Sequence, residues 1–210
     1  MAIQRNQRIG VFVDVQNMYY SGRFMYDAKV NFKNILSSAV SGRILIRAIA
    51  YVIKADETKK DIFFDALSMM GFEIKAKDLQ IFHGGAKKGD WDIGISMDAI
   101  ELAPKLDTIV LVSGDGDFVP LVQHLQRALG CRVEVLAFGK SASGKLKEAA
   151  DEFVDLDNNL RKYLIDTDIK KKHKLDNPID THTITNPANK KSSVVNIKRG
   201  PPVMKGASKK

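Results

Sequence analysis

Short apolar runs alternate with segments of helical periodicity from residue 8 to about residue 165, and this alternation constrains the fold most. The apolar runs predict strands because they are short and rich in branched residues: 8–13, 43–52, 72–76, 108–112, 132–138 and 152–156. The segments between them predict helices at 31–40, 56–70, 91–103, 118–129 and 144–150. Strands that alternate with helices of this length form a parallel sheet covered by helices. The predicted fold class is therefore α/β.

Charge is distributed unevenly along the 210 residues. The net charge is +8, yet residues 170–210 hold eleven Lys or Arg and two Asp, which gives +9 and leaves −1 for residues 1–169. The apolar periodicity also ends near residue 168. We therefore expect a folded domain over residues 1–168 and a basic, disordered tail over residues 169–210. Such a tail can bind phosphate backbones by releasing counterions. A solvated, disordered chain end without a binding function explains the same composition equally well.

Several classes of protein are excluded by composition. The single cysteine, Cys131, allows no intrachain disulfide and no cysteine-based zinc cage within one chain. The longest apolar stretch, 44–53, contains Arg47 and is far shorter than the roughly 20 residues that span a membrane. The segment before Asp14 has too few apolar residues for a secretory signal. We expect a cytoplasmic protein that does not bind a membrane.

Carboxylates stand at the ends of two predicted strands. Asp14 ends the first strand, and Asp115 and Asp117 follow the strand 108–112 in the sequence SGDGD. Asp92 opens the helix that follows the loop 83–89. Ligands of an open parallel sheet bind at the carboxyl ends of its strands. Acids gathered there repel one another unless a cation neutralises them, and oxygen ligands suit Mg²⁺ or Mn²⁺. Each single Asp also fits a helix cap or a turn.

Longer stretches of the chain resemble the NYN domain of the PIN-like nuclease superfamily, within it the bacterial LabA-like branch. They are VFVDVQN, KKGDWDIGISMDAIELA, DTIVLVSGDGDFVPLVQHLQRALGCRVEVLAF and LKEAADEFVDL, in this order within residues 8–160. The resemblance implies a PIN-like three-layer α/β fold, in which helices flank a parallel central sheet. It also implies an acidic pocket that binds Mg²⁺ or Mn²⁺, ribonuclease activity, and RNA as the partner.

The family motif assigns catalytic and metal-binding roles to Asp14, Asp92, Asp115 and Asp117. Asn17 matches the polar residue that supports the first of these acids. Asp98 also matches the motif, but six residues turn it about 120° away from Asp92 on an ideal helix, so we expect a supporting role. Ser113 lacks the His–Asp pattern of a nucleophilic serine, and it too is assigned a supporting role.

Two further groups of residues suit a nucleic acid. The loop 83–89 (HGGAKKG) offers glycines together with Lys87 and Lys88 to a phosphate backbone, although it lacks the spacing of a P-loop. Aromatic side chains follow the first strand, and they fit base stacking and the core packing of a short helix: Tyr19, Tyr20, Phe24 and Tyr26.

The leading hypothesis is a Mg²⁺- or Mn²⁺-dependent ribonuclease in which two ions activate a water and stabilise the leaving oxygen. A Toprim-like domain also carries Asp-x-Asp after a strand, but it needs a glutamate where this chain has Asp14. The alternative from another class is a non-catalytic PIN-like module that binds RNA or a protein and acts in regulation. The full set of acids favours catalysis, because concentrated negative charge beside phosphate does not help a binder. A homodimer or a protein partner stays open.

Overall fold

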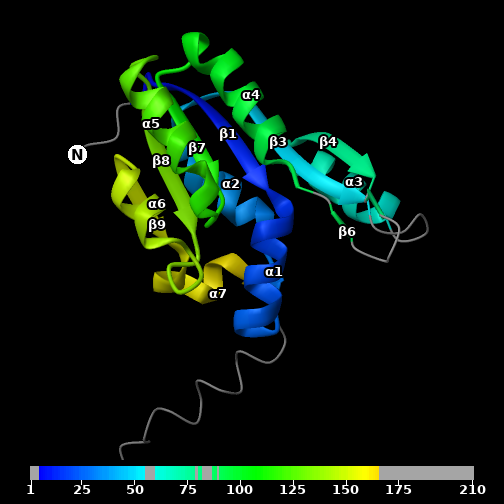
Figure 1. Cartoon of the computed structure of the whole chain (residues 1–210). Coiled ribbons are helices and arrows are strands. Elements are labelled where there is room, and N and C mark those ends of the chain that lie inside the picture. Colours follow the sequence, from blue (N-terminus) through cyan, green and yellow to red (C-terminus); the bar gives the residue numbers. More distant parts are fainter. Residues whose placement is uncertain (1–4, 55–59, 79, 82–86, 89, 166–210) are drawn as a thin grey trace, which may run out of the picture.

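A sheet of parallel strands forms the centre of the molecule (Figure 1). The computed structural model describes residues 5–54, 60–78, 80–81, 87–88 and 90–165. In sheet order the strands are β4 (Glu73–Asp78), β3 (Ile44–Lys54), β1 (Arg8–Asp14), β7 (Thr108–Val112), β8 (Arg132–Ala137) and β9 (Glu152–Asp155). Every neighbouring pair in this sheet is parallel, as the alternation of strands and helices predicts.

Helices cover both faces of the sheet, because successive side chains of a strand point to opposite faces. Val11 and Val13 belong to a core shared with α1 (Val15–Tyr26), α2 (Phe32–Val40), α3 (Lys60–Met69) and α7 (Leu160–Tyr163). Phe12 belongs to the core of the other face, with α4 (Asp92–Leu102), α5 (Val119–Arg127) and α6 (Gly144–Ala149). Figure 1 shows α4 and α5 in front of the sheet and α2 behind it. The three-layer α/β architecture is therefore confirmed.

The order of the strands places a reversal at the middle of the sheet. From β1 the chain winds outwards through β3 to β4, then returns to the other side of β1 and winds outwards through β7, β8 and β9. The winding direction reverses between β1 and β7. In doubly wound sheets the crevice for a ligand lies at the carboxyl ends of the strands beside such a reversal. The topology thus directs attention to the ends of β1 and β7.

Short elements complete the fold. The strands β2 (Lys29–Val30) and β10 (Leu164–Ile165) pair antiparallel, as do β5 (Gln80–Ile81) and β6 (Lys87–Lys88). Single turns of 3₁₀ helix lie at Ala103–Lys105, Gly116–Phe118 and Leu156–Asn159. The first of these contains Pro104, which stands in its opening turn, where a missing N–H costs no helical hydrogen bond.

The helix α1 was not among the helices that periodicity predicts. Only Val15, Met18 and Gly22 of its residues are buried, while several aromatic side chains point to solvent, so the apolar pattern is not one-sided. The other predicted elements are found with their boundaries shifted by a few residues at most, apart from the start of the helix predicted at 56–70, part of which lies outside the described residues. The expected tail and most of the loop 83–89 also lie outside them. No described helix is both long enough and apolar enough to span a bilayer.

Candidate functional site

Asp14 occupies the junction between β1 and α1. Its extended backbone ends the strand, and its Oδ1 accepts a hydrogen bond of 3.0 Å from the backbone N–H of Asn17, which caps the helix. Its Oδ2 accepts a hydrogen bond of 3.4 Å from the hydroxyl of Ser113, which follows β7. The residue is 8% exposed. Asp14 therefore lies beside the reversal of the sheet, held by two neutral donors.

The turn after β7 carries the next two acids. Asp115 precedes the 3₁₀ turn Gly116–Phe118, and its Oδ1 accepts a hydrogen bond of 3.0 Å from the N–H of Asp117. The buried Oγ of Ser113 accepts the N–H of Asp115 at 3.2 Å while it donates to Asp14. Ser113 thus joins the two strand ends that bear carboxylates.

The backbone of this turn is fixed from two sides. The side-chain Oδ1 of Asn17 accepts the N–H of Gly114 at 2.9 Å, and the carbonyl of Gly114 accepts the N–H of Ser143 at 2.9 Å. A Cβ atom on Gly116 would lie 2.8 Å from Oγ of Ser143, and one on Gly114 would lie 3.1 Å from Cα of Ala142. Both glycines have an ordinary φ. The close approach of the loop before α6 therefore leaves little room for a side chain at either position.

The four candidate acids act on one another electrostatically. Burial raises the pKa of Asp14 to about 6, and the charges of Asp92 and Asp115 add to this effect. Burial also raises the pKa of Asp92, as do the charges of Asp115, Asp90 and Asp117, while Lys77 lowers it. Within the described ranges no ion pair includes Asp14, Asp92, Asp115 or Asp117. The fold thus brings these acids into one group, in which Lys77 compensates part of the charge on Asp92.

The donor set of this group fits a hard divalent cation. In the part of the chain that the structure describes, no three His, Cys, Asp or Glu side chains converge closely enough to hold one metal ion. Mg²⁺, however, is usually bound through one or two carboxylates and completes its shell with water and substrate phosphate. Carboxylates whose pKa is raised by burial and by like charges are groups that a nearby cation would stabilise in their ionised form.

Asp98 belongs to a different cluster. It accepts hydrogen bonds of 2.6 Å from the hydroxyl of Tyr51 and of 2.7 Å from Nζ of Lys75. Burial raises the pKa of Asp98, but the hydrogen bonds from Lys75 and Tyr51 outweigh it and hold the pKa below its usual range. Tyr51 pairs in register with Asp14 on one side and with Lys75 on the other. Asp98 therefore anchors α4 to β3 and β4 beside the acidic group.

The start of α4 is held by an aromatic side chain. Trp91 precedes the helix, and its Nε1 donates a hydrogen bond of 2.9 Å to the carbonyl of Val52. A Cβ atom on Gly94 would lie 2.5 Å from the indole, so the ring packs directly on the first turn of the helix. The ring also meets Tyr51 edge to face, with centroids 5.3 Å apart. Asp92, the next residue, is positioned by this packing.

Some of the residues around the candidate acids could be expected from the sequence, and others could not. Trp91, Tyr51 and Lys75 were not predicted to support the site, because their contacts depend on the register between strands and on how α4 lies across them. Lys87 and Lys88 form β6, but their side chains lie outside the described part, so their role in nucleic-acid binding stays a prediction.

Comparisons with known proteins agree with the fold and with the motifs. The NYN domain family matches residues 8–157. The chain is 28% identical over 173 residues to the low amplitude and bright protein LabA of Synechococcus elongatus, which covers 78% of this chain and 91% of that protein. A crystal structure of a protein of unknown function from Vibrio parahaemolyticus superposes with a TM-score of 0.70 at 36% identity, over 79% of this chain and all of that one. This chain belongs to the NYN domain family, in its LabA-like branch, and has the nuclease-like PIN fold of that family.

Proposed function

We propose that this protein is a Mg²⁺- or Mn²⁺-dependent ribonuclease. The observation that carries the proposal is the group of carboxylates at the reversal between β1 and β7, where burial and the charges of Asp92 and Asp115 raise the pKa of Asp14 to about 6. Perturbed carboxylates cluster at functional sites because folding alone does not favour them. Membership in a nuclease-like family supports the same assignment.

The roles of the residues follow from their positions. Asp14, Asp92, Asp115 and Asp117 would hold the divalent ions, which supply a Lewis acid for the phosphodiester and lower the pKa of an attacking water. Ser113 and Asn17 tie the turn after β7 to the start of α1, so they hold Asp115 and Asp14 in a fixed relation. Trp91 and Asp98 keep α4 against the sheet and with it the carboxylate of Asp92.

A non-catalytic regulatory module that binds RNA or a protein is the second candidate. One observation favours it: the described side chains do not form a group of three that could ligate an ion by themselves. The two candidates differ in whether a metal ion turns binding into cleavage.

The location, the partners and the domain organisation of the proposed enzyme are proposals as well. We infer a cytoplasmic protein that binds RNA, with a homodimer or a protein partner left open. We also infer that residues 1–168 form the catalytic domain and that the +9 charge of residues 170–210 adds sequence-independent attraction to RNA.

A cleavage assay tests the proposal. Purified protein is incubated with end-labelled single-stranded RNA and Mn²⁺, with and without a chelator. Wild type should cleave only without the chelator, and Asp14→Asn and Asp115→Asn should abolish cleavage. The matched control is Asp27→Asn, because this exposed carboxylate lies at the far end of α1 and pairs with Arg23.

Two results would contradict the ribonuclease assignment. If wild type binds the RNA but never cleaves it with Mg²⁺ or Mn²⁺, the regulatory module is the better assignment. If both Asn variants cleave as fast as wild type, the activity does not arise from this site.

A further inference from the structure

Aromatic side chains are exposed along α1, which begins at the candidate acid Asp14. Tyr19 is 51% exposed, Tyr20 45% and Phe24 78%. Tyr26, in contrast, is partly buried: it packs on the buried Phe138 and donates its hydroxyl to Asp157. Core packing therefore accounts for Tyr26 alone among the four aromatic residues of this segment, and the other three lie on the surface of α1.

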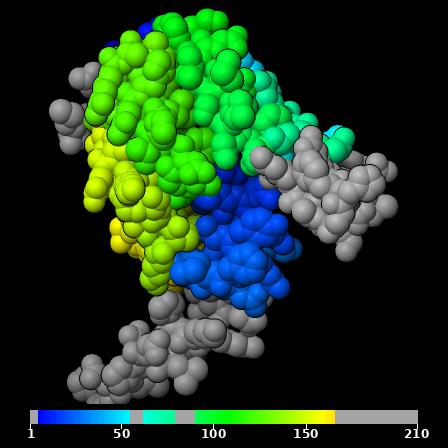
Figure 2. Space-filling model, in the orientation of Figure 1, coloured from blue at the N-terminus to red at the C-terminus, as the bar shows by residue number. Residues whose placement is uncertain are grey.

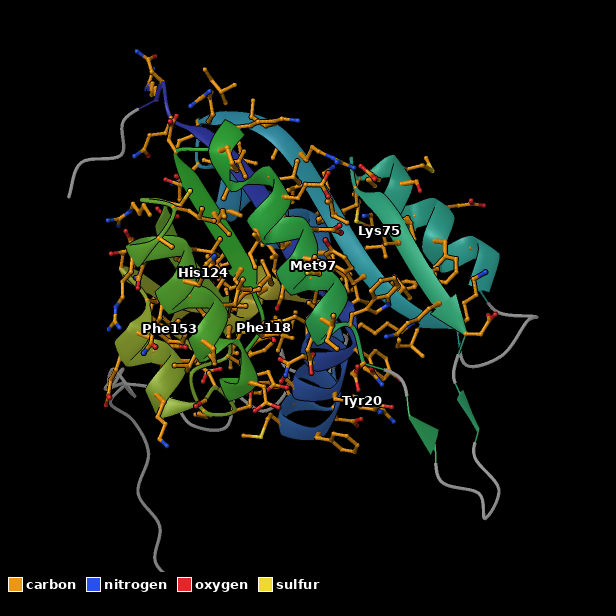
Figure 3. All side chains as sticks on the ribbon, turned by 45° about the horizontal axis from the view of Figure 1, so that its top comes forward. Tyr20, Lys75, Met97, Phe118, His124 and Phe153 are labelled. Atoms are coloured by element: carbon orange, nitrogen blue, oxygen red, sulfur yellow. The ribbon has the colours of Figure 1, made fainter. Side chains whose placement is uncertain are left out.

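Two of the exposed rings already form a stack. Tyr20 and Phe24 are four residues apart on the helix, and their rings lie 5.5 Å apart at an interplanar angle of only 13°. Tyr19 meets Tyr20 edge to face at 5.5 Å. Figure 3 shows Tyr20 on the outer side of α1. The protein thus presents aromatic faces in the orientation in which a further planar ring can be added.

The stack lies on the same side of α1 as the link to the acidic group. Asn17, whose side chain binds Gly114, is three residues before Tyr20 and seven before Phe24, so the three share a helix face. Seven residues correspond to about 10 Å along the axis. In Figure 2 the surface of α1 (blue) continues directly into that of α4 and α5 (green). A chain lying along this face would pass from the rings to the carboxylates.

Arg23 is the basic residue next to the stack among the described residues of α1, and it pairs with Asp27. Arg23 lies one turn beyond Tyr19 and Tyr20, with its side chain 58% exposed. The loop after β8 is next to α1, because the hydroxyls of Ser141 and Ser21 are 3.0 Å apart, and this loop brings the exposed Lys140 over the ring of Tyr26. Cations beside aromatic faces are complementary to a strand of phosphates and bases.

We propose that Tyr20 and Phe24, with Tyr19 at their edge, form a stacking subsite for unpaired bases of an RNA strand whose backbone reaches the acidic group. The proposal rests on the ribonuclease function proposed above and names a binding subsite for it. In a duplex the faces of the bases are covered by their neighbours, so this subsite selects single-stranded segments. A protein partner would bury apolar area equally well but would not need two parallel rings next to basic side chains.

Binding without cleavage tests the subsite. Fluorescence anisotropy in EDTA measures the affinity for a labelled single-stranded RNA 12-mer, for the same strand annealed to its complement, and for an abasic strand of equal length. The double variant Tyr20→Ala/Phe24→Ala should weaken single-strand binding about tenfold or more and leave the other two probes unchanged. The variant Tyr20→Phe/Phe24→Tyr should bind like wild type, because it keeps both rings.

The control is Met69→Ala, since Met69 is an apolar residue on α3 that is even more exposed than Tyr20 and Phe24. Equal weakening of all three probes would show a general loss of charge or fold and would overturn the subsite. Unchanged RNA binding, or a change only in the oligomeric state measured by light scattering, would overturn it too. Because this assay contains no metal, its result does not depend on catalysis. Wild type that binds here but does not cleave RNA with Mg²⁺ or Mn²⁺ in the cleavage assay would refute the ribonuclease and leave the subsite standing.

Discussion

The two ends of the central sheet differ in whether their buried charged side chain has a counter-charge. Near the amino ends of the strands, the guanidinium of Arg43 is 2% exposed and donates to both carboxylate oxygens of Glu134, at 2.7 and 2.8 Å, and to the carbonyl of Ala39 at 2.6 Å. Arg8 and Asp107 form a second pair at this end. At the carboxyl ends, Asp14 is buried to a similar degree, but its hydrogen-bond donors are neutral.

This difference separates stability from function. A buried ion pair with all of its hydrogen bonds made keeps its two charges compensated at every pH at which both groups are ionised. A buried carboxylate without a cation lowers the stability of the folded state above its pKa, and proteins retain such groups where a ligand supplies the missing charge. The compensated pairs at the amino ends therefore contribute to stability, whereas we propose that the carboxyl ends bind a partner that supplies positive charge.

Breaking the compensated end should have the largest effect. The substitution Glu134→Gln leaves the buried guanidinium of Arg43 without a counter-charge and should lower the free energy of unfolding by about 3–5 kcal/mol. Urea unfolding at neutral pH measures it. The control Asp107→Asn removes the partner of the exposed Arg8 and should leave the midpoint nearly unchanged. Equal, small effects of both substitutions would remove the contrast between the two ends.

Relieving the uncompensated end should stabilise the protein. Without metal, folded Asp14 keeps its proton up to a pKa of about 6, whereas the unfolded chain releases it near 3.8, so stability falls as the pH rises through this window. At about pH 7.5, which is above the pKa of folded Asp14, Asp14→Asn should therefore be more stable than wild type by about 3 kcal/mol. Near about pH 4 the two proteins should be equally stable. Asparagine caps a helix as well as aspartate does.

Urea unfolding of both proteins in EDTA at these two pH values gives the difference directly. All other carboxylates are present in both proteins, so the difference reports Asp14 together with its electrostatic coupling to Asp92 and Asp115. A variant that is clearly less stable at neutral pH would show that Asp14 serves the fold as a charged cap.

Supplying the missing charge should stabilise the carboxyl end modestly. Mn²⁺ should raise the melting midpoint of wild type by a few degrees, because the protein offers only part of a coordination shell and the affinity without substrate is weak. The triple variant Asp14→Asn/Asp115→Asn/Asp117→Asn should show no shift. Isothermal titration of the two proteins provides a second measurement, and equal binding by both would place the metal elsewhere.

The anchor of α4 should give the smallest change. Asp98→Asn removes one charge from its pair with Lys75 and should cost about 1 kcal/mol of stability, since both side chains are partly exposed. The fold lowers the pKa of Asp98, so the pair stabilises the protein at any pH above the ordinary pKa of aspartate. This stabilisation is lost as the pH falls through the lowered pKa. A double-mutant cycle with Lys75→Met isolates the pair, and additive effects would contradict a direct interaction.

Much of the fold could be predicted from the sequence because local patterns determine it. The strand predicted at 108–112 is β7 with the same boundaries, and the strand predicted at 8–13 differs from β1 by one residue. The helix α1 was not predicted, because its exposed aromatic side chains interrupt the one-sided apolar pattern of a surface helix. The order of strands in the sheet also required the structure, since β1 pairs with two strands distant in sequence.

The candidate acids could be predicted for the same reason: each follows a recognisable strand or opens a recognisable helix. Their partners could not. The hydrogen bonds of Ser113 to Asp14 and of Asn17 to Gly114 cross about 100 residues of sequence, and no local pattern records them. The same holds for Tyr51 and Lys75 around Asp98, which depend on the register of β3 with β4.

The central position of β1 has a consequence for how the molecule folds. Asp14 and Ser113 are 99 residues apart in the sequence, and their strands pair only after β7 has been inserted beside β1. Closing a loop of this length costs entropy before any contact compensates it, which slows folding of sheets with distant strand pairs. A fragment that ends before β7 contains neither the second strand end nor the turn with Asp115. The acidic group therefore cannot form before the long-range pairing of β1 with β7.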